Sequence, residues 1–271
     1  MGKIKVGLAL GGGGLCGIAH IGFLQVLEEN NIQIDMISGI SMGAIIGGLY
    51  ASGVSLKELE ERAIKIDKKD ILGLNAFKIL KESLFSGKKI GNYLSSVLKT
   101  ENIEDAKIKF YAQACDLLSG DMYTFEKGKF VDALRASSAI AGLFSPVFLN
   151  DTCYVDGGAI ESVPFKVLKE KGADVVIAVN CLNDNKLDKL PSGSIATFMA
   201  SYNITQNMVW RLSKIVDKKY YNLYCFDNTK GVDPISVKLE NVERLIESGR
   251  KSAHRYLNRI KKLIEKKNKI N

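Results

Sequence analysis

The segment Gly39-Ile40-Ser41-Met42-Gly43 could hold a reactive hydroxyl at a sharp turn. It follows a short apolar stretch and precedes a helical one, which is the context in which G-x-S-x-G exposes a nucleophilic serine at a helix N-terminus. A serine that only caps a helix is the other reading, but such a cap does not need glycine on both sides. The pattern therefore favours a nucleophile.

A run of glycines, 11–14 with a further one at Gly17, could bind an anion. Glycines between a strand and a helix expose consecutive backbone N–H groups at the helix N-terminus. Gly12, Gly14 and Gly17 also match the G-x-G-x-x-G of dinucleotide-binding proteins, whose ribose-binding acid follows the second strand. Asp35 is near the required distance but stands at the start of that strand. A dinucleotide site and a plain turn without ligand stay as alternatives.

A carboxylate stands at the end of a third apolar segment, in Asp156-Gly157-Gly158. It is expected at the C-terminal edge of the sheet, where open α/β folds bind their ligands, although Asp-Gly is also a common turn. A serine nucleophile needs a base, and Asp156 is the best candidate. A serine, backbone anion donors and this carboxylate would supply the three roles that acyl transfer requires.

Neither of the two histidines is well placed to act as the base. His20 lies on the first predicted helix, where we expect a structural hydrogen bond. The order Ser41, Asp156, His254 matches the α/β-hydrolase triad, but His254 is expected on the solvated face of an amphipathic helix.

Alternating strands and helices must position these residues. Strand–helix–strand–helix at this spacing indicates a parallel sheet, and Ser55 with Glu58 predicts a capped helix start. Strands are predicted at 3–10, 34–38, 109–115, 122–125, 153–155, 174–179 and 222–226. Helices are predicted at 16–29, 44–52, 133–139, 165–171, 195–220 and 237–267, the last with a break at Gly249, and the whole of 55–107 is predicted to be helical and amphipathic. Residues 183–193 are predicted to form a loop. We expect one domain over 1–271, with its core at about 4–180 and a helical portion with a basic end at 181–271.

The composition is that of a globular protein, with 271 residues, 46% hydrophobic and 25% charged. Five cysteines without a C-x-x-C pair favour reduced thiols in the cytoplasm over a disulfide framework or a zinc site. No metal or other cofactor is expected. The uncharged stretches 6–27 and 36–56 are long enough to span a bilayer, but glycine clusters break both, so we expect buried strand–turn–helix units.

The net charge of +8 belongs to the C-terminal segment alone. Residues 250–271 carry nine Lys or Arg and one Glu, and the first 249 residues are neutral. This distribution does not indicate a nucleic-acid partner. Apolar residues recur there at helical spacing, so the segment either packs as a closing helix or also presents its basic face to an anionic membrane as a peripheral contact.

The glycine run, the serine elbow and the D-G-G sequence, in this order and spacing, resemble the patatin-like phospholipase family in its bacterial branch. Intervening segments are also similar, at 17–22, 112–120, 135–138, 142–146, 154–164 and 172–179. The resemblance covers about residues 4–180 well and 195–260 loosely.

The resemblance implies a three-layer α/β/α fold with a mainly parallel central sheet. It also implies a serine acyl hydrolase, similar to phospholipase A, that acts on phospholipid or another lipid ester without a metal. Ser41 would attack the ester carbonyl, Asp156 would accept its proton, and the amides of Gly12, Gly13 and Gly14 would form the oxyanion hole. The remaining motif glycines would support these groups, namely Gly17, Gly39, Gly43, Gly157 and Gly158.

The chain departs from the family pattern beside these groups. Cys16 stands where the family usually has Lys or Arg, which would weaken electrostatic stabilisation or change substrate preference. Ala141 replaces a frequent proline, and Glu161 and Ser162 replace asparagines, which affects the loops near Asp156. A non-catalytic lipid-binding or regulatory scaffold of the same fold stays as an alternative.

Overall fold

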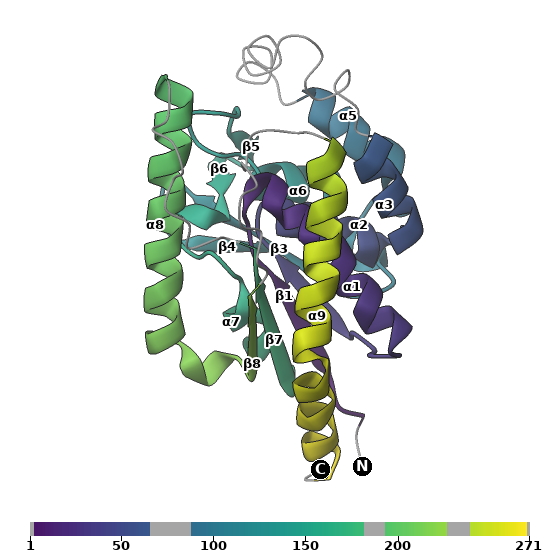
Figure 1. The fold of residues 1–271 in the computed structure, drawn as a ribbon. Helices are drawn as coiled ribbons and strands as arrows, with labels where there is room; N and C mark the ends of the chain where they lie inside the picture. The colour runs from purple at the N-terminus through teal and green to yellow at the C-terminus, as the bar shows by residue number, and fades with distance from the viewer. Residues whose placement is uncertain (1–2, 66–87, 182–192, 227–238, 270–271) are drawn as a thin grey trace.

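A mixed β-sheet forms the centre of the molecule (Figure 1). The computed structural model describes residues 3–65, 88–181, 193–226 and 239–269. Within these residues the strand order is β5-β6-β3-β2-β1-β7-β8, with β4 also paired to β3. The strands are β1 (Val6–Leu10), β2 (Met36–Gly39), β3 (Lys109–Asp116), β4 (Met122–Phe125), β5 (Val147–Leu149), β6 (Thr152–Asp156), β7 (Val175–Asn180) and β8 (Leu223–Phe226). The neighbours from β3 to β8 pair in parallel, whereas β3–β4, β3–β6 and β5–β6 are antiparallel.

Helices cover both faces of this sheet. They are α1 (Ala19–Glu29), α2 (Met42–Ser52), α3 (Leu56–Lys65), α5 (Lys88–Val97), α6 (Phe130–Ser137), α7 (Phe165–Glu170), α8 (Ser194–Val216) and α9 (Leu239–Asn268). Short 3-10 turns are η1 (Gly14–Ile18), η2 (Ile103–Asp105), η3 (Gly157–Ala159) and η4 (Lys218–Tyr220).

Alternating side chains of the strands divide the core into layers, because successive residues of a strand point to opposite faces. Leu8 and Leu10 of β1 belong to the main core with residues of α1, α2 and α9. Ala9 belongs to a second core, with Phe165 of α7 and Trp210 of α8. The predicted three-layer α/β/α class with a mainly parallel sheet is therefore confirmed.

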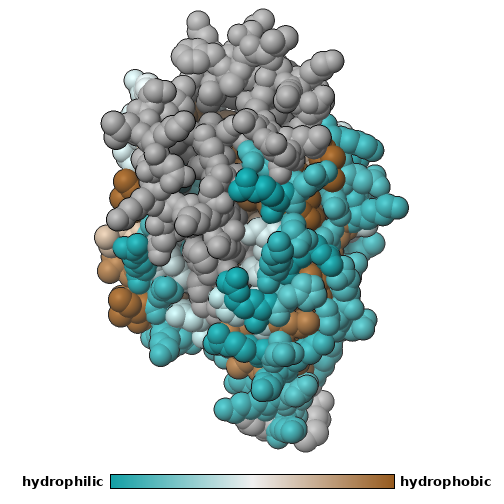
Figure 2. Space-filling model, in the orientation of Figure 1, coloured by the Kyte–Doolittle hydropathy of each residue, from teal (hydrophilic) through white to brown (hydrophobic). Residues whose placement is uncertain are grey.

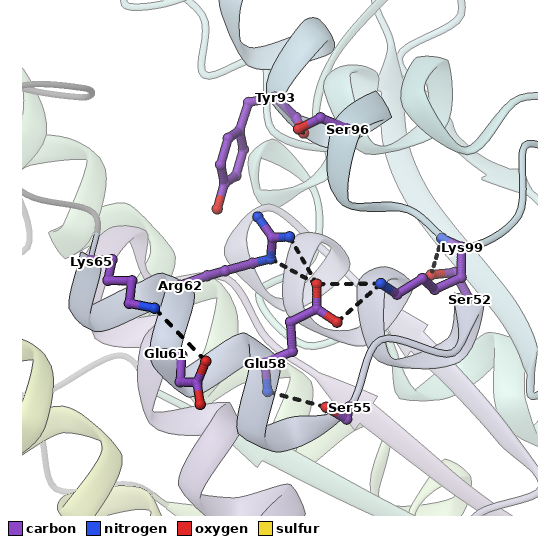
Figure 3. Close-up of polar contacts among 9 residues, drawn as sticks. All are labelled: Ser52, Ser55, Glu58, Glu61, Arg62, Lys65, Tyr93, Ser96 and Lys99. Carbon is purple, nitrogen blue, oxygen red and sulfur yellow. Dashed lines mark hydrogen bonds and ion pairs between the residues drawn. The ribbon is translucent and has the colours of Figure 1, made fainter.

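Helix α3 begins with the predicted cap. The Glu58 amide donates to Ser55 Oγ at 3.1 Å. The Glu58 carboxylate points elsewhere: Oε1 lies 2.8 Å from an Arg62 guanidinium nitrogen and Oε2 lies 3.0 Å from Lys99 Nζ (Figure 3). The pair with Lys99 connects α3 to the chain that follows α5, whereas the pair with Arg62 lies within α3.

Some predicted elements differ from the observed ones. The three-residue strand β5 was not predicted; Asn150 and Asp151, both with positive φ, turn it back into β6. Residues 98–107 contain only η2 rather than helix. The central part of the predicted 55–107 helical region, residues 66–87, and most of the predicted loop at 183–193 lie outside the described residues. The stretches 6–27 and 36–56 form strand–turn–helix units, as predicted. None of the helices in the described ranges combines the length and apolar character that a membrane span requires.

The predicted break of the last helix at Gly249 is wrong, because α9 runs unbroken through this position. A Cβ on Gly249 would overlap the carbonyl oxygen of Ala19, and a Cβ on Gly22 of α1 would overlap that of Ile246. The two glycines therefore let the backbones of α1 and α9 touch where they cross, as Figure 1 shows. Apolar residues of α9 join the main core, so the helix packs on the domain as one of the two interpretations predicts; they are Val242, Leu245, Ile246, Ala253 and Ile260.

We predict that Gly249→Ala lowers the free energy of unfolding by about 2 kcal/mol, the scale of an overpacked core position. Alanine is a better helix former than glycine, so without the close crossing the same substitution would raise the free energy of unfolding. The sign of the change in this free energy therefore tests whether the two backbones touch. Chemical denaturation of this variant measures the change, with Asn258→Ala on the exposed face of α9 as the control. A Gly249→Ala protein as stable as the unaltered chain would contradict the close crossing.

Candidate active site

Ser41 lies on a strained turn between β2 and α2. Its backbone angles are φ 56° and ψ −126°, which a residue with a side chain rarely adopts. The Ser41 amide donates to the carbonyl oxygen and to Oγ of Ser137, each at 3.1 Å, and these bonds hold the turn. Two carbonyl oxygens at the end of β1, those of Leu10 and Gly11, lie where a Cβ on Gly43 would be. The elbow is thus pressed against the end of β1.

Asp156 ends strand β6 with its side chain buried. Its Oδ1 accepts a hydrogen bond from the Gly158 amide at 2.8 Å. Burial raises the pKa of this carboxyl group to about 6, while hydrogen bonding by the Ser41 hydroxyl and the Gly158 amide lowers it. The other carboxylate oxygen, Oδ2, is buried and accepts no hydrogen bond of ordinary geometry from the described residues. The contact between Asp156 and the Ser41 hydroxyl is therefore looser than an ordinary hydrogen bond. Such loose contacts are common in active sites without substrate.

The glycine run forms the turn from β1 into η1. Gly13 and Gly14 have positive φ, at 147° and 54°. The Gly12 amide donates to the Ser162 carbonyl at 3.1 Å. The amides of Gly13 and Gly14 have no hydrogen-bond acceptor in the part of the chain that is described. Two of the three amides predicted to bind an oxyanion are therefore available, and the third is engaged.

One cavity brings these predicted groups together. It has about 310 Å³ of space between atoms, part of it open to solvent. Its lining includes Gly12, Gly13, Gly14, Ser41, Asp156 and Gly158, together with Ile140, Tyr202, Asn203 and Gln206. The other motif glycines lie outside it and allow close packing: Gly17 beside Met42, Gly39 beside Ala44, Gly43 beside β1 and Gly157 beside the Gln113 carbonyl.

Helix α8 supplies a wall of the cavity that sequence reasoning missed. Gln206 Nε2 donates to the Gly158 carbonyl, and Ser162 Oγ donates to the Gln206 carbonyl at 2.7 Å. Tyr202 faces the same loop, and burial together with the charge of Asp156 raises its pKa. The only signal in the sequence is the polar spacing of Tyr202, Asn203 and Gln206 along one side of a helix, which is also ordinary for a solvated face.

The two histidines lie away from the cavity lining. His20 is fully buried, with Nε2 2.9 Å from the Gly11 carbonyl, so the predicted structural hydrogen bond is confirmed. Burial lowers the pKa of His20 to about 4 and keeps the ring neutral. His254 is exposed on α9. Cys16 is buried in the main core and is likewise absent from the lining.

Asp35 occupies the end of β2 opposite to the glycine turn. Its Oδ2 accepts from the Val6 amide at 2.8 Å, and its Oδ1 pairs with Lys3 at 3.1 Å. Asp35 therefore joins the beginnings of β1 and β2 at the edge of the sheet opposite to the glycine turn. At this edge it is too remote to hold a ribose bound at the glycine turn.

Comparisons with known proteins identify the family to which the chain belongs. The model of the family described as patatin-like phospholipase matches residues 8–169, and the chain belongs to this family. It is 33% identical over 178 residues to "Lysophospholipase NTE1" of Scheffersomyces stipitis, covering 65% of this chain and 12% of the relative. It is 36% identical over 176 residues to an "Uncharacterized NTE family protein" of Mycobacterium tuberculosis, covering 65% and 49%. The chain thus spans from about an eighth to half of the length of these relatives.

Among solved structures, VipD from Legionella pneumophila is similar to this fold. The TM-score is 0.55 with 14% sequence identity, over 94% of this chain and 67% of VipD. At this identity the likeness concerns the fold alone.

We predict that Ser41→Gly is more stable to unfolding than Ser41→Ala by about 1 kcal/mol. Glycine relieves the strain at φ 56°, while its greater freedom in the unfolded chain offsets part of the gain. Both variants lack the hydroxyl, so the comparison isolates the backbone. Paired denaturant titrations measure it, and an alanine variant equal to or more stable than the glycine variant would show that the turn is unstrained.

Proposed function

We propose that this chain is a serine acyl hydrolase that cleaves lipid esters with Ser41 and Asp156. The observation that carries the proposal is the single cavity that joins the Ser41 hydroxyl, the Asp156 carboxylate and the available amides of the glycine turn. Membership of the patatin-like phospholipase family and the lysophospholipase name of a relative support a phospholipid or a related lipid ester as the substrate.

The chemistry follows from the charge state of Asp156. With a pKa of about 6, the carboxylate is mostly ionised at neutral pH and more basic than an exposed aspartate. It accepts the Ser41 proton as Oγ attacks the ester carbonyl, and returns that proton to the leaving alcohol as the acyl-enzyme forms. A water molecule then gives a proton to Asp156 and attacks the acyl group. As the bond between the acyl group and Ser41 Oγ breaks, Asp156 returns this proton to Oγ and the fatty acid is released.

The negative charge that develops on the carbonyl oxygen needs nearby donors. The amides of Gly13 and Gly14 are the available ones, because the Gly12 amide is bonded to Ser162. We therefore assign the main oxyanion contacts to Gly13 and Gly14, with Gly12 holding the turn in place. This role is carried by the backbone, so it does not depend on the residue at Cys16.

The enzyme would meet its substrate at a lipid surface. The basic face of α9 is one element for such contact, because its apolar residues pack inward and cations such as Lys262 and Lys266 are exposed. A cation near an anionic membrane contributes about 1 kcal/mol, so several together would hold the protein peripherally.

We predict that Ser41→Ala and Asp156→Asn each reduce kcat/KM for a soluble short-chain ester by about 10⁴-fold or more, because nucleophile and base act as a unit. Two matched controls keep the activity: Asp116→Asn, a turn carboxylate outside the cavity, and His254→Ala, the histidine of the alternative triad. Initial rates, with circular dichroism to verify folding, provide the measurement. Near-normal rates in Ser41→Ala would refute the nucleophile, and an inactive His254→Ala would replace the dyad by a triad.

We predict that kcat/KM rises with pH and levels off above an apparent pKa of about 6, as Asp156 loses its proton and becomes able to act as a base. His20, with a pKa of about 4, titrates below this range. A pH series on the soluble ester, with the wild type and His254→Ala side by side, tests the assignment. The rise should be the same in both; its loss in His254→Ala, or a flat profile between pH 5 and 8, contradicts it.

A further inference from the structure

Helix α8 exposes an apolar stripe on its outer side. Ile204, Met208, Leu212 and Ile215 follow one another at spacings of three or four residues, which places them on one face. Ile204 is 66% exposed, Leu212 55% and Ile215 78%. The opposite side, with Gln206 and Trp210, is buried against the protein. We call these four residues the α8 stripe.

The α8 stripe lies at the margin of the molecule. Figure 1 shows α8 at one edge, away from α9, and Figure 2 shows hydrophobic atoms along the same edge. A soluble helix normally turns its apolar side toward the core and its polar side to water. Here the outer side of α8 carries large apolar side chains in addition to the inner contacts, so it needs another partner.

The charges that helix α8 itself carries are of one sign. The helix from Ser194 to Val216 contains no Asp or Glu. The neighbouring acid, Asp217, is buried and paired with Lys166 at 2.9 Å. Exposed cations cluster toward the C-terminal end of the helix, namely Arg211, Lys214, Lys218 and Lys219. Apolar residues flanked by cations are typical of helices that lie in the interface of an anionic membrane.

The same helix forms a wall of the candidate active site. Tyr202, Asn203 and Gln206 line the cavity that contains Ser41. Phe198, which is partly exposed, stacks on Tyr202 with ring centroids 6.1 Å apart. A lipid surface held by α8 would therefore lie next to the cavity wall.

We propose that the α8 stripe docks on an anionic lipid surface and brings ester substrate to the Ser41 cavity. This inference rests on the proposed lipid ester hydrolysis, which supplies the reason for a lipid surface. A second copy of this chain is a weaker candidate, because α8 contains no Asp or Glu that could pair with the cations of the other copy. Helix α9 offers mainly charge, since its apolar residues are wholly or partly buried against the main core, whereas α8 offers apolar surface and charge together.

The test compares binding to vesicles of phosphatidylcholine alone and of phosphatidylcholine mixed equally with phosphatidylglycerol. The variant carries Ile204→Gln, Met208→Gln and Leu212→Gln, which keep helix propensity and remove apolar surface. A matched control carries Leu118→Gln and Phe148→Gln, two exposed apolar residues outside α8. A second comparison changes Lys261, Lys262, Lys266 and Lys267 of α9 to Gln.

We expect the α8 variant to lose about tenfold or more of its partitioning to anionic vesicles, while the control keeps it. Hydrolysis of a soluble ester should be unchanged in both, because none of these residues lines the cavity. Equal vesicle binding by wild type and α8 variant overturns the proposal. The proposal is also overturned if sedimentation velocity shows that the wild type is a dimer and the α8 variant a monomer, while both bind vesicles equally.

Two further readouts keep the result decisive. If circular dichroism shows that the triple variant is unfolded, the single variant Ile215→Glu replaces it. Ile215 is the most exposed residue of the α8 stripe, and we expect this variant to lose vesicle binding as well. Co-sedimentation does not require turnover, so a wild type that binds vesicles but hydrolyses no soluble ester refutes the proposed function and leaves the docking surface supported.

Discussion

The close approach of helix α2 to the end of strand β1 holds the candidate site together. The carbonyl oxygens of Leu10 and Gly11 occupy the space that a side chain at Gly43 would need. Strands β1 and β2 are parallel neighbours, so both chains leave the sheet at the same edge and both turn into helices there. This contact sets the strained Ser41 turn beside the glycine turn. A bulkier residue at Gly43 would separate the Ser41 hydroxyl from the amides of the glycine turn.

Burial of Asp156 is the second requirement of the proposed mechanism, because it makes the carboxylate more basic. Exclusion of water raises the pKa of the carboxyl group, whereas the same effect lowers the pKa of buried His20 and leaves that ring a poor base. Helix α8 holds the loop that follows Asp156, because Gln206 forms hydrogen bonds with Gly158 and Ser162 of this loop. The inner side of the helix that lines the cavity therefore also positions the loop that follows Asp156.

The sequence predicted the parts of the structure that depend on local pattern. The glycine turn, the elbow at Ser41 and the strand-end Asp156 were all found, because each is a short motif at the junction of two regular elements. The parts that depend on contacts between distant segments were missed. Gln206 is 48 residues from its partner Gly158, and the engagement of the Gly12 amide by Ser162 has no local signal. The same reason explains Gly249, which looks like a helix break in sequence and serves as a crossing point in the fold.

In the proposed mechanism, Ser41 is a nucleophile activated by Asp156. Labelling with a fluorophosphonate, followed by mass spectrometry of the peptides, tests it most directly, because the reagent needs an activated serine and no lipid surface. We expect an adduct on Ser41 in the wild type and a much slower reaction in folded Asp156→Asn. An unlabelled Ser41 in folded protein, or equal labelling rates in the two proteins, would contradict it.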